Sequence, residues 1–312
     1  MRTLTKSVLA FAEAALSAAR AALPAYSHPS SPKKFTQHQH FAILALKDFL
    51  QTDYRGIVAM LSEWSDLRRV LELEQVPHYT AVFYAGRRLL KSQGFRKLLR
   101  ATVEEARAKK LLGKKARQVA IDSTGYESGR VSHYYARRSG RKLRHFPKFT
   151  ALCDTRSHLY LSGLMSQGPY PDDREFAPVV REAFAMHPFR ELLADAGYDG
   201  ENHHELVRNE LGARSIIPPT RGHPSPRPPA GAFRRRLAAR FPRKRYGQRW
   251  QVESCISQDK RRFGSAVAAH SYWSRCRGLG LRLLVHNLAL LLCRVLRLRP
   301  PMPRLQAVPC LV

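Results

Sequence analysis

Apolar residues recur at helical spacing between residues 39 and 112. Their pattern predicts four amphipathic helices, at residues 41–49, 57–61, 66–73 and 78–90. The turn Gln75-Val76-Pro77 separates the last two, and the final helix ends near Arg87 and Arg88. A helix, a short turn and a second helix with basic flanks are typical of a helix-turn-helix DNA-binding region. The same pattern fits an ordinary helical bundle, and the spacing leaves both interpretations open.

The spacing of apolar residues changes after a charged helical segment at 103–116. Short apolar runs typical of buried strands begin there. The predicted order is strand, hairpin, helix, strand, helix and strand, at residues 118–122, 149–164, 173–184, 192–195, 202–211 and 215–217. Asp172 or Asp173 would cap the first of these helices. This order predicts an α/β fold with a ribonuclease H-like domain, preceded by a helical N-terminal region.

Residues 1–38 do not show the pattern of a packed domain. The Ala/Leu-rich stretch 8–23 resembles a signal peptide in composition, but Glu13 and Arg20 interrupt it. We interpret that stretch as an amphipathic or poorly ordered leader. Residues 24–38, rich in Pro, Ser, His and Lys, are typical of a linker.

Residues 218–245 are dominated by Pro, Gly and Arg and contain no acidic residue. This composition predicts a mobile basic loop that builds no core. Further on, the apolar stretch 279–298 carries Arg282 and His286, which favour a buried or docking helix over a membrane span. The chain therefore divides into a leader and linker (1–38), a helical DNA-binding region (39–112), an α/β domain with a basic loop (113–299) and a tail (300–312).

The charge balance is strongly basic, with 54 Lys and Arg against 24 Asp and Glu, a net charge of +30. Such an excess indicates a polyanionic partner, because neutralising phosphates releases counterions. A solvated basic surface is the simpler alternative, and a membrane surface is disfavoured because no long amphipathic basic helix dominates. The five cysteines show neither a CxxC motif nor zinc spacing, which indicates reduced thiols in a cytoplasmic protein.

Two aspartates stand out because each directly follows an apolar, strand-like run. Asp122 ends the first predicted strand and Asp195 ends a later one. Ligands bind at the carboxyl ends of strands in open α/β sheets. Buried carboxylates that lie together need a counter-charge, and a cation is the usual solution. With Glu253 as a third ligand, these residues predict a site for two Mg²⁺ ions about 3.5–4 Å apart, with Mn²⁺ as a substitute.

Four residues with complementary chemistry share one stripe of a predicted helix: Tyr246, Arg249, Glu253 and Lys260. On an ideal helix they fall within an arc of about 60°. The carboxylate suits a metal ion and the cations beside it suit phosphate, although a solvated cationic face has the same pattern. Trp250 lies on the flank, where it either stacks on a splayed base or packs in the core.

Three further residues with candidate chemistry receive structural interpretations. His203 and His204 are expected at a helix surface, and Asp199 in a turn.

These motifs resemble those of the DDE transposases of bacterial insertion sequences. The spacing Tyr246-x2-Arg249-x3-Glu253-x6-Lys260 matches the Y-(2)-R-(3)-E-(6)-K box of one broad group. The runs that begin at Asp122 (Asp-Ser-Thr-Gly) and at Asp195 (Asp-Ala-Gly-Tyr) resemble the first and second aspartate motifs. Residues 132–142, 216–219 and 76–80 are also similar, and the resemblance covers roughly residues 40 to 297.

The resemblance implies an enzyme that cleaves DNA with two metal ions and then joins the freed 3′-OH to target DNA. Its expected partners are double-stranded DNA, at the element ends and the target, and further copies of the chain in a dimer or larger assembly. The expected location is the cytoplasm, at the nucleoid, with no membrane. Two alternatives remain: a ribonuclease H-like nuclease or resolvase without strand transfer, and a domesticated DNA-binding protein. For the transposase, the expected DNA-binding residues are Arg87, Arg88, Tyr246, Arg249, Trp250 and Lys260.

Overall fold

A computed structural model describes residues 6–128, 146–219, 229–267, 269 and 271–298 of the chain. Its N-terminal half is a helical region. The six helices described there are α1 (Val8–Ala22), α2 (Gln37–Phe49), α3 (Tyr54–Glu63), α4 (Ser65–Val70), α5 (Tyr79–Leu89) and α6 (Ser92–Ala108). A capping box between Thr36 and Gln39 starts α2, since each side chain binds the backbone N–H of the other residue. The four helices predicted from the pattern correspond to α2 to α5.

The first helix differs from the expectation of a leader. Helix α1 packs against α2, α4 and α6, and the side chains of Phe11, Ala15 and Ala19 are fully buried. Phe11 stacks on Phe49 of α2, with 4.0 Å between the ring centroids. Ser7 caps the helix by accepting from the backbone N–H of Ala10. The Ala-rich sequence therefore gives a close-packed core helix of the helical region.

The second half is built on a mixed five-stranded sheet in the order β4-β3-β1-β5-β6. Strands β1, β3 and β4 are antiparallel neighbours, whereas β5 and β6 run parallel to β1. The strands are β1 (Val119–Gly125), β3 (Phe146–Asp154), β4 (Tyr160–Gly168), β5 (Glu191–Leu193) and β6 (Arg214–Ile216). Each strand overlaps a run predicted from the sequence.

Helices cover both faces of this sheet. Helix α8 (Asp173–Met186) packs on β3 and β4, on the face toward which Ser123 and Thr150 point. Helix α12 (Trp250–Phe263) packs on β1 and β3, on the opposite face, where Thr124 contacts Lys260. At the far edge lie α9 (Glu201–Glu205), a π-helical turn (Leu206–Glu210) and α10 (Ala232–Ala239). A small second sheet pairs β2 (Glu127–Ser128) with β7 (Ala266–Val267).

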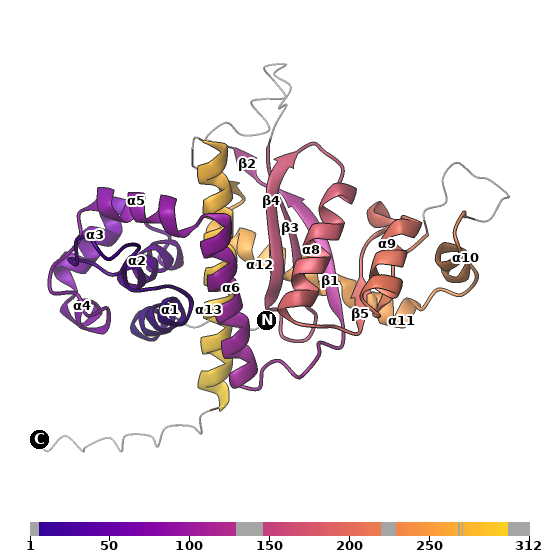
Figure 1. Ribbon diagram of the computed structural model, residues 1–312, viewed down its shortest axis with the longest axis horizontal. Helices are drawn as coiled ribbons and strands as arrows, with labels where there is room; N and C mark the ends of the chain where they lie inside the picture. The colour runs from indigo at the N-terminus through magenta and orange to yellow at the C-terminus, as the bar shows by residue number, and fades with distance from the viewer. Residues whose placement is uncertain (1–5, 129–145, 220–228, 268, 270, 299–312) are drawn as a thin grey trace, which may run out of the picture.

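The long helix α13 (Tyr272–Leu298) joins the two halves. It runs beside α6 between the helical region and the sheet (Figure 1), and packs against α1, α2, β3 and β4. Residues Tyr272–Cys293 are long and apolar enough to cross a membrane, but 78% of that stretch is buried inside the protein. Leu284, Val285 and Leu288 are fully buried. This agrees with the predicted buried or docking helix.

Two further expectations from the sequence are also wrong. The segment 218–245 is not a loop throughout, because it contains α10, which packs on α9. Arg234 of α10 forms an ion pair with Asp199, and Glu201 accepts from the backbone N–H groups that start the helix. His203 and His204 do not lie at a surface, since their exposed fractions are 3% and 0%. Residues 132–142 and the tail 300–312 lie outside the described residues.

Candidate active site

The two aspartates lie at equivalent places on neighbouring parallel strands. The ladder between β1 and β5 ends at the pair Ala120 and Leu193, and each aspartate lies two residues beyond it. Asp195 follows the end of β5, as predicted. Asp122 does not end its strand, because β1 continues to pair with β3 as far as Gly125.

Hydrogen bonds to the local backbone orient both carboxylates. Asp122 Oδ1 accepts from the backbone N–H of Ser123 at 2.9 Å, and Asp195 Oδ1 accepts from that of Gly197 at 2.8 Å. Asp195 thereby caps a short 3₁₀ turn, η1 (Ala196–Tyr198). A Cβ at Gly197 would lie 3.0 Å from Asp195 Oδ1, so glycine suits a position that the carboxylate covers closely.

The stripe from Tyr246 to Lys260 is not one continuous α-helix. Tyr246 ends α11 (Arg243–Tyr246), Arg249 ends the 3₁₀ turn η3 (Gly247–Arg249), and Glu253 and Lys260 lie on α12. A 3₁₀ turn has about three residues per turn, which alters the angular positions predicted with the α-helical period. The Arg249 guanidinium nevertheless reaches Glu253, and its Nη1 lies 3.9 Å from Asp122 Oδ2.

The three carboxylates and Arg249 share one electrostatic environment. Burial raises the pKa of Asp122 to about 6. The Ser123 N–H and Arg249 act in the opposite direction, and the negative charges of Asp195 and Glu253 raise the pKa further. Asp122 is therefore costly to ionise in this environment, and Arg249 supplies part of the neutralising charge.

The donor set suits a hard divalent cation, since all three side chains offer carboxylate oxygens. Among the residues that the structure describes, no group of three or more His, Cys, Asp or Glu is close enough to hold a metal ion. Arg249 bridges Asp122 and Glu253 in this arrangement. The residue types fit a metal site, whereas the side-chain positions are those of a carboxylate–guanidinium cluster.

An open cavity of about 530 Å³ lies beside two of the three carboxylates. Asp122, Thr124, Glu253 and Lys260 are among its lining residues. The Lys260 ammonium donates to Thr124 Oγ1 at 2.6 Å and to the Gly125 carbonyl at 2.9 Å, and it lies over the ring of Tyr126. Burial lowers the pKa of Lys260. Lys260 thus links α12 to the end of β1 by hydrogen bonds at the edge of the cavity.

A buried ion pair fixes α12 from the other side. Asp259 accepts from Tyr160 Oη at 2.8 Å and from His286 Nδ1 of α13 at 2.6 Å, and His286 Nε2 lies 3.0 Å from the His158 carbonyl. Both ring nitrogens of His286 face acceptors, so the ring is a doubly protonated imidazolium. The sequence motifs did not reveal this pair. In the sequence, the pair is indicated by the position of Asp259 on the apolar face of the predicted helix, beside Ile256.

The remaining predicted site residues lie at or near solvent. Trp250 is 53% exposed, which excludes the interpretation as a core residue. Tyr246 is partly buried against Phe241, with 5.1 Å between ring centroids, and its neighbours include Arg249. Arg87 and Arg88 are exposed on α5, where Arg87 lies over the ring of Tyr84.

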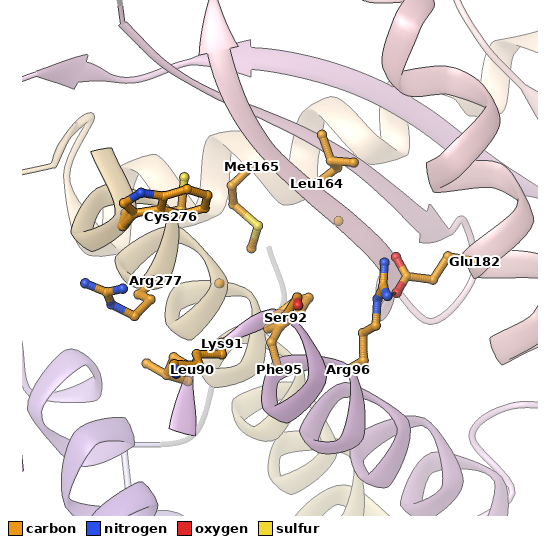
Figure 2. A pocket seen from close by; sticks show the side chains of 13 residues that line it. Leu90, Lys91, Ser92, Phe95, Arg96, Leu164, Met165, Glu182, Cys276 and Arg277 are labelled. Carbon is orange, nitrogen blue, oxygen red and sulfur yellow. Dashed lines mark hydrogen bonds and ion pairs between the residues drawn. The ribbon is translucent and has the colours of Figure 1, made fainter. Parts of the chain in front are cut away.

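A second cavity, of about 430 Å³, is lined by a different set of residues, and Figure 2 shows it from close by. It is formed where the start of α6, strand β4 and the start of α13 meet, and Phe95, Leu164 and Met165 give it an apolar lining. Arg96 and Glu182 form an ion pair at one side. None of Asp122, Asp195 and Glu253 lines this cavity, so we place the candidate active site at the carboxylate cluster.

Comparison with known proteins identifies a family for most of this chain. The model of the family described as "Transposase DDE domain" matches residues 113–288, which is more than half of the chain. No curated protein matches the chain. The matched range includes the whole five-stranded sheet, Asp122, Asp195 and Glu253, and it ends within α13. The chain therefore belongs to the family of proteins with a transposase DDE domain.

Proposed function

We propose that this transposase cleaves the ends of an insertion sequence and joins the freed 3′-OH ends to target DNA. The observation that carries the proposal is the electrostatic environment that Asp122 shares with Asp195 and Glu253. Arg249 lies between Asp122 and Glu253, and these two carboxylates line the open cavity beside β1. A buried carboxyl with a raised pKa beside further carboxylates is typical of a functional site. Membership of the transposase family supports DNA as the substrate.

The proposed metal ligands are Asp122, Asp195 and Glu253, with Mg²⁺ as the cofactor and Mn²⁺ as a substitute. When bound, a pair of such ions activates the attacking oxygen and stabilises the leaving oxygen of the phosphodiester. The protein keeps Asp122 and Asp195 oriented through their bonds to backbone N–H groups. The side chain of Glu253 is 48% exposed on α12 and bound to Arg249, and its carboxylate would turn toward the aspartates when Arg249 releases it.

The cations at the site have partners that DNA phosphates would replace. Arg249 is bound to Glu253 and lies near Asp122, whereas Lys260 is bound to Thr124 and Gly125. Guanidinium and ammonium groups form strong hydrogen bonds with phosphate oxygens. We propose that Arg249 and Lys260 transfer these bonds to the DNA backbone.

Further DNA contacts are proposed for two other surfaces. Tyr246 would contact the backbone next to Arg249, and the exposed Trp250 would stack on a base. Arg87 and Arg88, exposed on α5, would bind DNA from the helical region.

The wider proposal concerns domains and assembly. Three antiparallel strands followed by two parallel ones support a ribonuclease H-like fold for residues 113–299. Residues 39–112 would bind the element ends, and the packing of α1 assigns residues 8–22 to the same region. The spacing from Tyr246 to Lys260 supports the group with the Y-R-E-K box. A dimer or larger assembly on DNA, located at the nucleoid, would pair two ends.

The decisive experiment is a strand-transfer assay. A DNA fragment that carries the sequence flanking the gene, pre-cleaved at its 3′ end, is incubated with the protein, Mg²⁺ and a circular plasmid. We expect covalent joining by the native protein and none by Glu253→Gln, while Glu104→Gln, at an exposed position of α6, remains active. Full joining by Glu253→Gln would remove Glu253 from the site.

The second candidate function is a nuclease on the same fold that cuts DNA without joining it. The same assay separates the two, because a nuclease degrades or nicks the plasmid and leaves the labelled fragment unjoined. Both candidate functions would use Asp122, Asp195 and Glu253 as the residues that hold the metal ions for cleavage.

A further inference from the structure

The backbone does not hold the two aspartate segments together at the point where the carboxylates lie. Strands β1 and β5 pair only as far as Ala120 and Leu193, so their ladder ends before Asp122 and Asp195. Beyond that point a hydrogen bond between side chains joins the segments. Ser123 Oγ, next to Asp122, lies 2.7 Å from the hydroxyl of Tyr198, three residues after Asp195.

This hydrogen bond belongs to a chain of hydroxyls on the sheet face opposite to α12. Ser123 Oγ also lies 2.6 Å from Thr150 Oγ1 of β3, and Thr150 donates to the carboxylate of Glu175 on α8. The Lys148 ammonium lies 3.3 Å from the same carboxylate. Successive side chains of a strand point to opposite faces, so the Ser123 hydroxyl lies on the face of the sheet opposite to the Asp122 carboxylate.

The hydrogen bonds that link these hydroxyls all run in one donor-to-acceptor direction. Glu175, as a carboxylate, only accepts hydrogen bonds, so the single proton of Thr150 is used there. Thr150 must then accept from Ser123, and Ser123 must accept from Tyr198. Burial raises the pKa of Tyr198, which keeps the phenol protonated and able to donate. Aligned hydrogen bonds of this kind strengthen one another.

Tyr198 is itself rigidly held. Its exposed fraction is 1%, its ring packs against Phe176 with centroids 5.5 Å apart, and its carbonyl accepts from His203 Nδ1 at 2.8 Å. The turn from Asp195 to Tyr198 is closed by two bonds, from the N–H groups of Gly197 and Tyr198 to Asp195. A shift of Tyr198 therefore moves Asp195 with it.

We propose that Tyr198 is a positioning residue whose hydrogen bond to Ser123 sets the separation of Asp122 and Asp195. The inference rests on the proposed roles of these two aspartates. It gives a function to the hydroxyl groups of Ser123 and Tyr198, two residues that follow the aspartates in the sequence motifs. Small displacements of ligands are costly because a divalent ion requires defined distances.

A double-mutant cycle on the full-length protein tests this role. Tyr198→Phe and Ser123→Ala each remove one hydroxyl, and the double variant removes both. The readouts are the Mn²⁺ dissociation constant from electron paramagnetic resonance and the rate of Mn²⁺-dependent nicking of a supercoiled plasmid. We expect each single variant to weaken Mn²⁺ binding and nicking by about tenfold, and the double variant to be no worse than either.

Two controls distinguish positioning from a general loss of structure. Ser162→Ala removes another buried hydroxyl of the same sheet, which donates to Glu182 at 2.9 Å, and should leave both readouts unchanged. Ser123→Thr keeps a hydroxyl and should restore Mn²⁺ affinity and nicking. Urea unfolding of every variant reports stability separately, so a variant that fails to fold is recognised.

The outcomes separate this inference from the proposed function. If Asp122→Asn nicks DNA as the native protein does, the assignment of the active site itself is wrong. If Asp122→Asn is inactive but Tyr198→Phe keeps native Mn²⁺ affinity and nicking, only the positioning role is refuted. If the fold-losses of Mn²⁺ affinity and nicking rate in the two single variants multiply in the double variant, the positioning role is also refuted. Multiplied losses mean that the two hydroxyls act independently and not through their shared hydrogen bond.

Discussion

Replacing Asp122 by asparagine is expected to stabilise the metal-free protein while it abolishes cleavage. Burial raises the pKa of Asp122 from its usual 3.8 to about 6, and its side chain is only 20% exposed. A carboxyl with a raised pKa in the folded state binds its proton more tightly there than in the unfolded chain. Its contribution to stability is therefore most favourable below pH 3.8, and it becomes unfavourable as the pH rises through 6.

The magnitude follows from the size of the shift. A difference of about two pKa units corresponds to about 3 kcal/mol at pH 8, where Asp122 is ionised in both states. Asparagine avoids this cost and still accepts the hydrogen bond from the Ser123 N–H. The loss of attraction to Arg249 offsets part of the gain, so we expect Asp122→Asn to raise the free energy of unfolding by about 1–3 kcal/mol.

The assay is urea unfolding of both proteins in a chelator, at pH 4 and at pH 8. The gain should appear at pH 8 and nearly vanish at pH 4. Glu210→Gln is the matched control, because the hydrogen bond from Arg181 lowers the pKa of Glu210 and its removal should bring no gain at pH 8. A gain for Asp122→Asn that is equal at both pH values, or a loss at pH 8, would refute the reasoning.

Three further predictions concern the helices that surround the site. The pair with Asp259 raises the pKa of His286 to about 10 although burial opposes it, so unfolding free energy should fall as the pH rises from 6.5 through 10, and Asp259→Asn should flatten that decline. Leu284→Ala, at a fully buried position of α13, should cost about 2–5 kcal/mol in urea unfolding. Lys260→Ala should weaken DNA binding and reduce its salt dependence by about one counterion in fluorescence anisotropy, while the exposed Lys97→Ala should change little.

The elements that could be predicted from the sequence are those with a strong local signal. The apolar run before Asp122, the hairpin of β3 and β4 and helix α8 all appear where the pattern predicted them, although no side chain caps the start of α8. The start of α6 was missed because Ser92 and Gly94 are weak helix formers, and packing against α13 decides the outcome.

Features that depend on distant partners were not accessible from local patterns. Helix α10 forms in an acid-free basic segment because Asp199 and Glu201, more than 30 residues earlier, receive its N-terminus and Arg234. His203 is buried because Asp173, Phe176 and Tyr198 surround it, and none of these contacts has a spacing signature. The Y-R-E-K spacing predicted one α-helical stripe, but the 3₁₀ turn before α12 changes the angular arrangement of these residues.

The position of α13 has a consequence for how the chain folds during synthesis. This helix packs against α1 and α2 as well as β3 and β4, and it follows all of them in the sequence. Domains usually fold in order as they leave the ribosome. Here both the helical region and the sheet lack part of their core until α13 has been synthesised. We therefore expect both cores to be completed only after residue 298 has left the ribosome. The two halves are therefore expected to gain their final stability together.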